Sequence, residues 1–401
     1  MTTTSTERAE SWGTRTILLA ASSLTVMAGA TIAPALPAIE RHFAGTGGDI
    51  PLLTRLALTF PALFIAIFAP FAGSLADRYG RRRQLIIGIA LYAIAGVSGF
   101  FATSLPMMLV GRALLGLAVA AIMTAATALI ADYYTGPRRT AFLGLQAAFM
   151  SGGGVIFLAG GGYLAQIGWQ YPFLVYLLSL LILPLAFLFA FEPEKKATAV
   201  LSGGAPVAAS TVPMPLIVLL YGNMLIMQII FYMIPVQLPF HLEKLTGANP
   251  AESGQALALG TLAGAAMSFG FGKLRARFSN ATLLSAFALL MGTGYIGIGL
   301  SPNYGAVLAS LVVAGSGFGL LLPVTSVWLT SATPPALRGR IIGGLTTAVF
   351  AGQFLSPLIT KPLADQFGIA ATYVGAGIIT LCFGTVYLFL RRTLDAFSDP
   401  G

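Results

Sequence analysis

The sequence is short of charged residues. Asp, Glu, Lys and Arg make up only 9% of its 401 residues, whereas a soluble globular protein carries about 25%. Hydrophobic residues make up 57% of the chain, and the mean hydropathy is +0.86. So little charge excludes an ordinary soluble domain. We therefore interpret the chain as an integral membrane protein of the lipid bilayer.

Cysteine and histidine are almost absent. The single cysteine, Cys382, excludes an intrachain disulfide and a cysteine metal site. The sequence also lacks a G-x-x-x-x-G-K-[ST] phosphate loop and a nucleophile–base pair at a recognised spacing. We therefore expect no enzymatic activity, no cofactor and no metal site. Without an ATP site, any transport would be secondary and driven by a gradient.

Long apolar runs recur along the whole chain. A membrane-spanning helix needs about 20 apolar residues. We predict twelve spans, at 15–38, 53–76, 84–103, 106–130, 141–165, 172–191, 214–238, 254–272, 281–300, 305–330, 341–363 and 371–390. The Ala-, Gly-, Ser- and Pro-rich segment 192–213 is typical of a flexible linker between two halves, 15–191 and 214–390. Residues 1–14 and 391–401 are predicted to be tails.

The charge pattern gives the orientation. A net charge of +9 could suggest nucleic acid, but the basic residues fall mainly in short loops between spans. Cytoplasmic loops carry an excess of Lys and Arg. Placing both termini in the cytoplasm puts most of the 22 basic residues on that side. We expect a plasma-membrane protein (the inner membrane in a bacterium) with no nucleic-acid partner.

The most specific motif is the stretch GSLADRYGRRR, between the second and third predicted spans. Its informative residues are Gly73, Leu75, Asp77, Arg78, Gly80, Arg81, Arg82 and Arg83. A generic basic loop would need the arginines but neither the acid nor the two glycines. The stretch resembles the signature loop of the major facilitator superfamily. That resemblance covers nearly the whole chain. It implies an all-α membrane protein of twelve transmembrane helices in two six-helix pseudo-symmetric halves.

The resemblance also implies a gate. In families with this loop, its arginine meets an acid at the end of the fourth span, where Asp132 stands in this sequence. Charge-assisted hydrogen bonds of this kind are strong enough to bias one conformation. Our hypothesis is that Asp77, Arg81 and Asp132 form a latch that breaks when the transporter opens inward.

An internal repeat supports the two halves. One shift of the sequence pairs Gly73 with Gly272, Arg78 with Arg277, Gly116 with Gly315 and Gly153 with Gly352, among others. The second copy of the signature has decayed, since Ala276 stands where Asp77 does. Two repeated halves around a central substrate site are typical of secondary transporters.

Two further motifs resemble those of drug–proton antiporters, with departures. Segment 141–165 has the glycines Gly144, Gly153, Gly161 and Gly162, but Phe157 and Leu158 replace the usual Gly-Pro. Segment 31–39, TIAPALPAI, is similar to the first-span motif, but Ala28 stands where that motif carries its acid. These departures weaken the inference to drug–proton antiport.

Two basic residues suggest a different substrate. Arg112 lies inside the fourth span and resembles the buried-arginine motif of the superfamily, which assists proton transfer or binds an anion. The alternative is an arginine neutralised by backbone carbonyls and a polar neighbour. Lys361 either forms an i,i+4 ion pair with Asp365 or an anion site with Arg112 or Arg55.

No acid falls at the centre of a span, although proton coupling usually needs a buried carboxylate or histidine. The remaining coupling candidates are Glu40 and His42 at the outer end of the first span, and His241 and Glu243 at the outer end of the seventh. For both histidines the alternative is an interfacial side chain with its polar tip in the wet headgroups.

A central cavity would be lined by polar and aromatic residues near the middle of their spans. The candidates are Thr25, Thr124, Gln146, Phe149, Asn223, Gln228, Tyr232, Phe350 and Gln353. Apolar walls with a few polar groups suit an amphipathic organic molecule. For the aromatic residues the alternative is ordinary packing. The amides are better candidates, because an amide in lipid needs a partner.

These features leave three hypotheses. The first is proton-coupled efflux of amphipathic or drug-like compounds by alternating access, with a small-molecule substrate and protons as partners. The second is an importer or exchanger of a small organic anion, because Arg112 and Lys361 lie in spans that lack central acids. The third is a non-transporting binding protein on a transporter scaffold, against which the intact signature loop argues. The two-half design works as a monomer.

Overall fold

The structure is a computed structural model that describes residues 9–193, 214–334 and 337–396. Within these ranges it contains helices and loops but no strand, and twelve helical segments are long and apolar enough to cross a membrane. The prediction of twelve spans is therefore confirmed, with ends that differ by a few residues. Most of the predicted linker 192–213, and parts of both predicted tails, lie outside the described residues.

The first half contains six spans. Its elements are α2 (Trp12–Ala30), η1 (Ala33–Ala35), α3 (Leu36–His42), α4 (Ile50–Tyr79), α5 (Arg81–Val97), η2 (Ser98–Phe101), α6 (Leu105–Tyr133), α7 (Gly136–Ile167), η3 (Tyr171–Leu177) and α8 (Leu178–Phe189). The first span therefore consists of α2, η1 and α3 in succession. Its interruption follows from Pro34 and Pro37, which have no N–H to donate to the preceding turn.

The second half repeats this design. Its elements are α9 (Met214–Phe231), α10 (Met233–Thr246), α11 (Pro250–Arg275), α12 (Asn280–Leu300), α13 (Tyr304–Ser331), α14 (Arg338–Phe367), α15 (Ile369–Phe389) and α16 (Arg391–Ala396). The seventh span is also interrupted, between α9 and α10. Here Pro235 removes the N–H that would bond to the carbonyl of Phe231.

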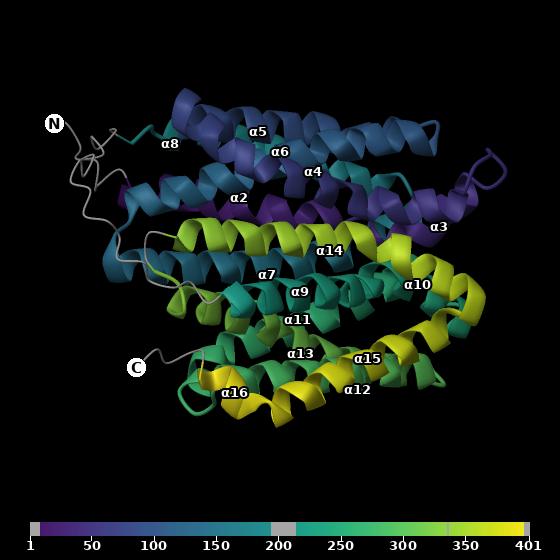
Figure 1. Cartoon of the computed structure of the whole chain (residues 1–401). Helices are drawn as coiled ribbons and strands as arrows, with labels where there is room; N and C mark the ends of the chain where they lie inside the picture. Colours follow the sequence, from purple (N-terminus) through teal and green to yellow (C-terminus); the bar gives the residue numbers. More distant parts are fainter. Residues whose placement is uncertain (1–8, 194–213, 335–336, 397–401) are drawn as a thin grey trace.

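The helices run side by side along one long direction, and the start of α2 and the short helix α16 lie at the same end of the bundle (Figure 1). We call this the loop end, because Arg81 of the signature loop pairs there with the last turn of α6. The opposite end, where α3 and α10 lie (Figure 1), we call the far end.

Glycines let two helices of the second half touch backbone to backbone. On α11, Gly260 and Gly264 face Gly315 and Gly319 of α13. A Cβ atom on Gly264 would lie 3.0 Å from the carbonyl oxygen of Gly315, and Cβ atoms on Gly315 and Gly319 would collide with the carbonyls of Gly260 and Gly264. Small residues at this spacing are how membrane helices approach closely without a hydrophobic driving force.

Candidate functional site: a two-ended seam

The signature loop forms a compact ion cluster at the loop end. The guanidinium of Arg81, at the start of α5, pairs with the carboxylate of Asp132 on α6. It also lies 3.4 Å from the carboxylate of Asp77 and 3.4 Å from the carbonyl oxygen of Ala128. The structure thus brings together the three residues of the proposed latch, all within the first half. Arg78 stacks over its neighbour Tyr79, with the guanidinium carbon 5.3 Å from the ring centroid.

A third acid, Glu192, joins this cluster, and the sequence analysis did not identify it. Glu192 accepts hydrogen bonds from the backbone N–H groups of Arg81 at 2.8 Å and Arg82 at 2.9 Å. A carboxylate there satisfies the unpaired amides at the start of α5 and opposes the positive end of its dipole. Gly80 has φ of +98° and lies against this carboxylate, so a side chain at that position would be strained and crowded.

The second half has a similar cap. The carboxylate of Asp395 on α16 accepts a hydrogen bond of 3.2 Å from the backbone N–H of Ala281, at the start of α12. In both halves, then, an acid after the last span caps the helix of the third span of that half. The sequence signal was an acid just beyond the sixth and the twelfth apolar runs, where we predicted a linker (Glu192) and a tail (Asp395).

The interface between the two halves, which we call the seam, is joined by polar side chains at the far end. Within the part of the chain that the structure describes, the side-chain hydrogen bonds that join the halves are Arg41 to Glu243, Arg55 to Gln237 at 3.1 Å, and Gln255 to Tyr163 at 2.6 Å. A cleft of about 240 Å³ lies over this end, lined by residues of η1, α3, α10 and α11. The polar contacts that join the two halves are therefore concentrated at one end of the molecule.

Glycine contacts between α7 and α11 show the same asymmetry. Toward the far end, a Cβ atom on Gly162 would lie 2.6 Å from the carbonyl oxygen of Pro250, and one on Gly254 would lie 2.5 Å from that of Leu158. Toward the loop end, a Cβ atom on Gly144 would meet nothing within 4 Å, and Phe149 is 47% exposed. The halves are thus in backbone contact at the far end and apart at the loop end.

This asymmetry shows in which arrangement of the halves the latch residues are paired. The Arg81–Asp132 pair is formed although the halves are apart at the loop end, so its formation does not require that end to be closed. Its partners on α4, α5 and α6 all belong to the first half. The cluster therefore holds together the loop end of one half, and it does not bridge the seam in this state.

We expect Asp132→Asn to destabilise the protein more than Asp77→Asn. The side chains of Arg81 and Asp132 are only 26% and 28% exposed, whereas that of Asp77 is 73% exposed. Loss of the half-buried pair should lower the free energy of unfolding by about 1 kcal/mol, and loss of the exposed pair by a few tenths. Thermal unfolding in detergent measures both. Equal effects of the two variants would contradict the central role of Asp132.

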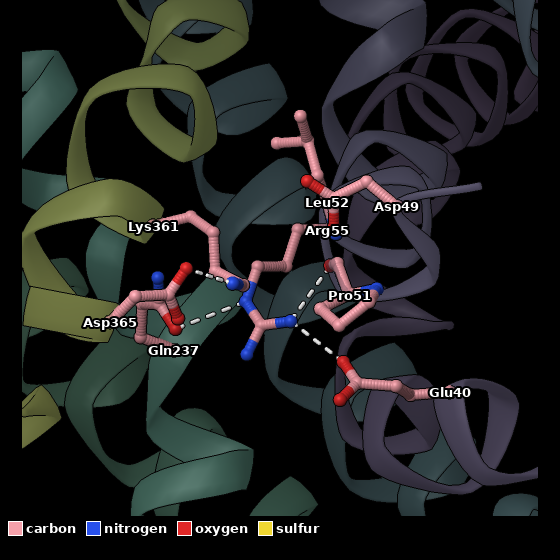
Figure 2. A network of polar contacts seen from close by, with 8 residues as sticks. All are labelled: Glu40, Asp49, Pro51, Leu52, Arg55, Gln237, Lys361 and Asp365. Carbon is pink, nitrogen blue, oxygen red and sulfur yellow. Dashed lines mark hydrogen bonds and ion pairs between the residues drawn. The ribbon is translucent and has the colours of Figure 1, made fainter. Parts of the chain in front are cut away.

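At the far end, a buried ion network crosses the seam. Arg55 of α4 is only 4% exposed. Its Nη1 donates to the Glu40 carboxylate and to the carbonyl oxygen of Pro51, each at 2.7 Å, while its Nε donates to the side-chain oxygen of Gln237 on α10 (Figure 2). The guanidinium carbon also lies 3.9 Å from the ring centroid of Phe240. A buried charge needs such pairing, because desolvation alone is expensive.

Lys361 of α14 belongs to the same network. It is 9% exposed and pairs with Asp365 one turn further along α14, so the i,i+4 ion pair is formed. Figure 2 shows this pair beside Arg55 and Gln237. The buried cations of the far end thus each have a carboxylate partner, Glu40 for Arg55 and Asp365 for Lys361.

Arg112 lies elsewhere, inside the first half. It is 2% exposed, and its Nη1 donates to the carbonyl oxygen of Ala28 at 3.1 Å and to the hydroxyl of Tyr176 at 2.9 Å. Its guanidinium carbon lies 5.0 Å from the ring centroids of both Phe173 and Tyr176. Carbonyl, hydroxyl and aromatic groups therefore surround this charge. Its carbonyl acceptor is that of Ala28, the position where the antiporter motif carries an acid.

The four coupling candidates do not form one group. Glu40 and Glu243 are engaged in the far-end ion pairs with Arg55 and Arg41. His42 is exposed and stacks on Trp169, with ring centroids 4.7 Å apart. These contacts place three of the candidates at the far-end surface or seam.

His241 corrects the alternative interpretation of the histidines as interfacial side chains. It is only 6% exposed, and its Nε2 lies 3.3 Å from the carbonyl oxygen of Ile298 on α12. Its ring centroid is 5.8 Å from that of Tyr373 on α15. It is therefore packed among helices of the second half. Nothing in its sequence neighbourhood distinguished it from an interfacial residue.

The cavity candidates of the first half lie on α2, α6 and α7. Gln146 of α7 donates from Nε2 to the hydroxyl of Ser22 on α2 at 2.7 Å. Thr25 donates to the carbonyl of Ser22 in its own helix, and Thr124 faces Gly73 on α4. Phe149 on α7 is half exposed. The candidates of the first half would thus offer a substrate one amide, Gln146, and one aromatic ring, Phe149.

The candidates of the second half divide into two groups. Tyr232 reaches toward α2, because its hydroxyl would lie 3.4 Å from a Cβ atom on Gly29, and Phe350 and Gln353 are partly exposed on α14. Gln228 is 5% exposed and packs against Gly352 of α14. These contacts place Tyr232 at the seam and Gln228 between helices of one half.

Asn223 was expected to line the central cavity, but its side chain is buried against another helix of the second half. It is 3% exposed, and its side-chain oxygen accepts a hydrogen bond of 2.6 Å from the hydroxyl of Tyr387 on α15. In this state Asn223 therefore contacts a neighbouring helix, and its role in binding substrate stays a prediction. Its partner is a tyrosine of another helix, and the spacing of the two residues in the sequence gives no sign of their contact.

The fold and the seam agree with the comparisons to known proteins. The family model of the Major Facilitator Superfamily matches residues 18–300 and 238–400. The chain therefore belongs to the Major Facilitator Superfamily. Among solved structures, a D-xylose–proton symporter superposes with a TM-score of 0.79 at 18% identity, over 94% of this chain and 97% of that one. A bacterial homologue of the human lysosomal transporter Spinster has a TM-score of 0.76 at 16% identity, over 96% and 98% of the two chains.

Curated relatives are similar along most of the chain. The quinolone resistance protein NorA of Staphylococcus aureus is 22% identical over 350 residues, which is 86% of this chain and 89% of that one. The quinolone resistance protein NorB of Staphylococcus aureus is 33% identical over 168 residues, or 41% of this chain and 35% of the relative. The protein is thus a multi-pass transporter of the superfamily.

Proposed function

We propose that this transporter exports amphipathic, drug-like organic molecules by alternating access, and that protons drive the export. The observation that carries the proposal is the similarity to a quinolone resistance protein over 86% of this chain. The candidate cavity residues are in keeping with this proposal, because Gln146, Phe149 and Tyr232 would offer the substrate an amide and aromatic rings. Such walls suit a substrate with large apolar surface and few polar groups.

The orientation is part of this proposal. We place the loop end in the cytoplasm, because the arginines of the signature loop lie there and short basic loops stay inside. The halves are in contact at the far end and apart at the loop end. With this orientation, the present state would take up substrate from the cytoplasm and the other state would release it outside. The linker 192–213 would then lie in the cytoplasm and join two halves that rock about the seam.

The contacts support export of drug-like molecules more than transport of organic anions. An anion carrier would need a buried cation that is available to the substrate. Lys361 is paired with Asp365, and Arg55 with Glu40. Arg112 is enclosed by Phe173 and Tyr176 on the first-half side. We therefore place the substrate against neutral walls between the halves.

Inverted membrane vesicles test the proposed function. We expect a pH gradient, acid inside, to drive accumulation of a fluorescent quinolone, and collapse of that gradient by nigericin to release it. Dissipating only the electrical potential with valinomycin should have a smaller effect. Vesicles without the protein are the control. Accumulation that survives nigericin and valinomycin together would rule out proton coupling. Uptake of small carboxylates in place of quinolones would overturn the drug-export proposal.

A further inference from the structure

Two buried tyrosines hold the first span near its interruption. Tyr92 of α5 donates a hydrogen bond of 2.7 Å to the carbonyl oxygen of Leu24, and Tyr176 of η3 donates one of 2.8 Å to that of Ala28. Both side chains are fully buried, and their ring centroids are 5.6 Å apart. Their hydroxyl groups thus end on the backbone of the last two turns of α2, six residues (Leu24) and two residues (Ala28) before its last residue, Ala30.

The second half has the same arrangement. Tyr295 of α12 donates to the carbonyl oxygens of Ile230 at 2.8 Å and Phe231 at 3.1 Å, and Tyr373 of α15 donates to that of Met233 at 2.9 Å. These two rings are also fully buried, with centroids 5.5 Å apart. Each half therefore directs one tyrosine from its third span and one from its sixth span onto the interrupted span.

The chemistry of an interrupted helix explains why donors are needed there. The last four carbonyls of a helix have no partner within it, and inside a membrane protein no bulk water can replace that partner. At the end of α9, each of the last four carbonyl oxygens accepts a hydrogen bond. These carbonyls accept from the N–H of Tyr232 (Gln228), the hydroxyl of Ser356 (Ile229) and the hydroxyl of Tyr295 (Ile230 and Phe231).

The segments beyond the two interruptions are the ones that close the far end. On α3 lie Glu40 and Arg41, and on α10 lie Gln237 and Glu243. These residues form the ion pair of Arg41 with Glu243 and the network around Arg55. The backbone geometry at each interruption therefore determines where the groups that close the seam are placed.

We propose that Tyr92, Tyr176, Tyr295 and Tyr373 are positioning residues for transport. They form two tyrosine clamps that hold the interruptions of the first and seventh spans, so that α3 and α10 meet at the far end. When that end opens, α3 and α10 swing about the clamped points. This inference goes beyond the proposed substrate, because it concerns the far-end gate whatever the transporter carries.

The symmetry distinguishes the clamps from tyrosines that merely fill space. Tyr387 is a buried tyrosine of the same half, 3% exposed, but its hydroxyl donates to the side chain of Asn223 and not to a helix interruption. It provides a matched control, since Tyr387→Phe also removes one buried hydroxyl from a hydrogen bond. A purely structural role would make Tyr387→Phe and Tyr295→Phe equivalent at the gate.

The test measures opening of the far end with a thiol reagent. In a Cys382→Ser background, Ser253→Cys places a single thiol at a position that is 2% exposed and lines the far-end cleft. We expect Tyr295→Phe and Tyr373→Phe to raise its labelling rate about tenfold. The first removes a donor from the last carbonyls of α9, and the second removes a donor from the carbonyl of Met233 at the start of α10. Tyr387→Phe should stay within about twofold of the parent, at a comparable loss of thermal stability.

Equal labelling of Tyr295→Phe and Tyr387→Phe would overturn the proposal. Tyr92→Phe and Tyr176→Phe repeat the measurement from the other half, so a variant that fails to fold does not leave the question open. Labelling needs neither substrate nor a proton gradient. A failure of quinolone export in vesicles would therefore contradict the proposed function alone and leave the clamp result intact.

Discussion

Replacing Gly162 with valine is expected to reduce transport about a hundredfold. A Cβ atom there would lie 2.6 Å from the carbonyl oxygen of Pro250 and 3.0 Å from the Cα atom of Gly254. Both obstacles are backbone atoms of the other half, so no side chain can rotate away. The clash can be removed only if α7 and α11 separate at the far end. A mismatch of this kind costs about 3 kcal/mol, which corresponds to about a hundredfold shift away from the far-end-closed state.

The neighbouring Gly160 provides the control. It lies on the same helix, yet a Cβ atom there would meet nothing within 4 Å. Gly160→Val should therefore transport like the parent, although it adds the same side chain to α7. Substrate flux in vesicles and labelling of Ser253→Cys report the two consequences separately. If Gly162→Val and Gly160→Val transported equally well, closure by backbone contact at the far end would be wrong.

The second large effect is expected at the buried ion network. Glu40→Gln removes the carboxylate that lies 2.7 Å from the guanidinium of Arg55, which is 4% exposed. Leaving a buried cation without its partner costs about 3–5 kcal/mol when both groups are fully buried. Because 28% of the Glu40 side chain is exposed, we expect a loss of about 2–3 kcal/mol in the free energy of unfolding.

Two comparisons make this prediction specific. Glu243→Gln breaks the Arg41–Glu243 pair at the same end, whose side chains are 60% and 38% exposed. That change should cost less than about 1 kcal/mol. Adding Arg55→Met to Glu40→Gln removes the unpaired charge and should restore most of the lost stability. Thermal unfolding measures all three variants. A double variant less stable than Glu40→Gln alone would refute the argument from the unpaired charge.

The sequence predicted the fold well because the membrane imposes simple rules. Each span must be about 20 apolar residues long and satisfy its own backbone. Length and hydropathy therefore locate all twelve spans. The signature loop could also be recognised from the sequence, since its glycines, acid and arginines lie within one short stretch. The contact of Arg81 with Asp132 followed from the resemblance, and the structure forms it.

The candidate site was less predictable, because its contacts join residues that are far apart in the sequence. Asn223 and Tyr387, or Arg55 and Gln237, come together only after several helices have packed. Interruptions of the first and seventh spans could be inferred from Pro34, Pro37 and Pro235. The tyrosines that complete those interruptions could not, since a tyrosine in a span has the same appearance whether its hydroxyl reaches a carbonyl or a side chain.

The carboxylate caps also bear on how the chain is assembled during synthesis. The cap of α5 comes from Glu192, which lies 111 residues after Arg81, and the cap of α12 comes from Asp395, 114 residues after Ala281. The helix of each third span therefore receives its capping carboxylate only after the end of its own half has been synthesised. The first half can close as a unit before the seventh span emerges from the ribosome. The second half is completed only when Asp395, beyond its sixth span, has been translated.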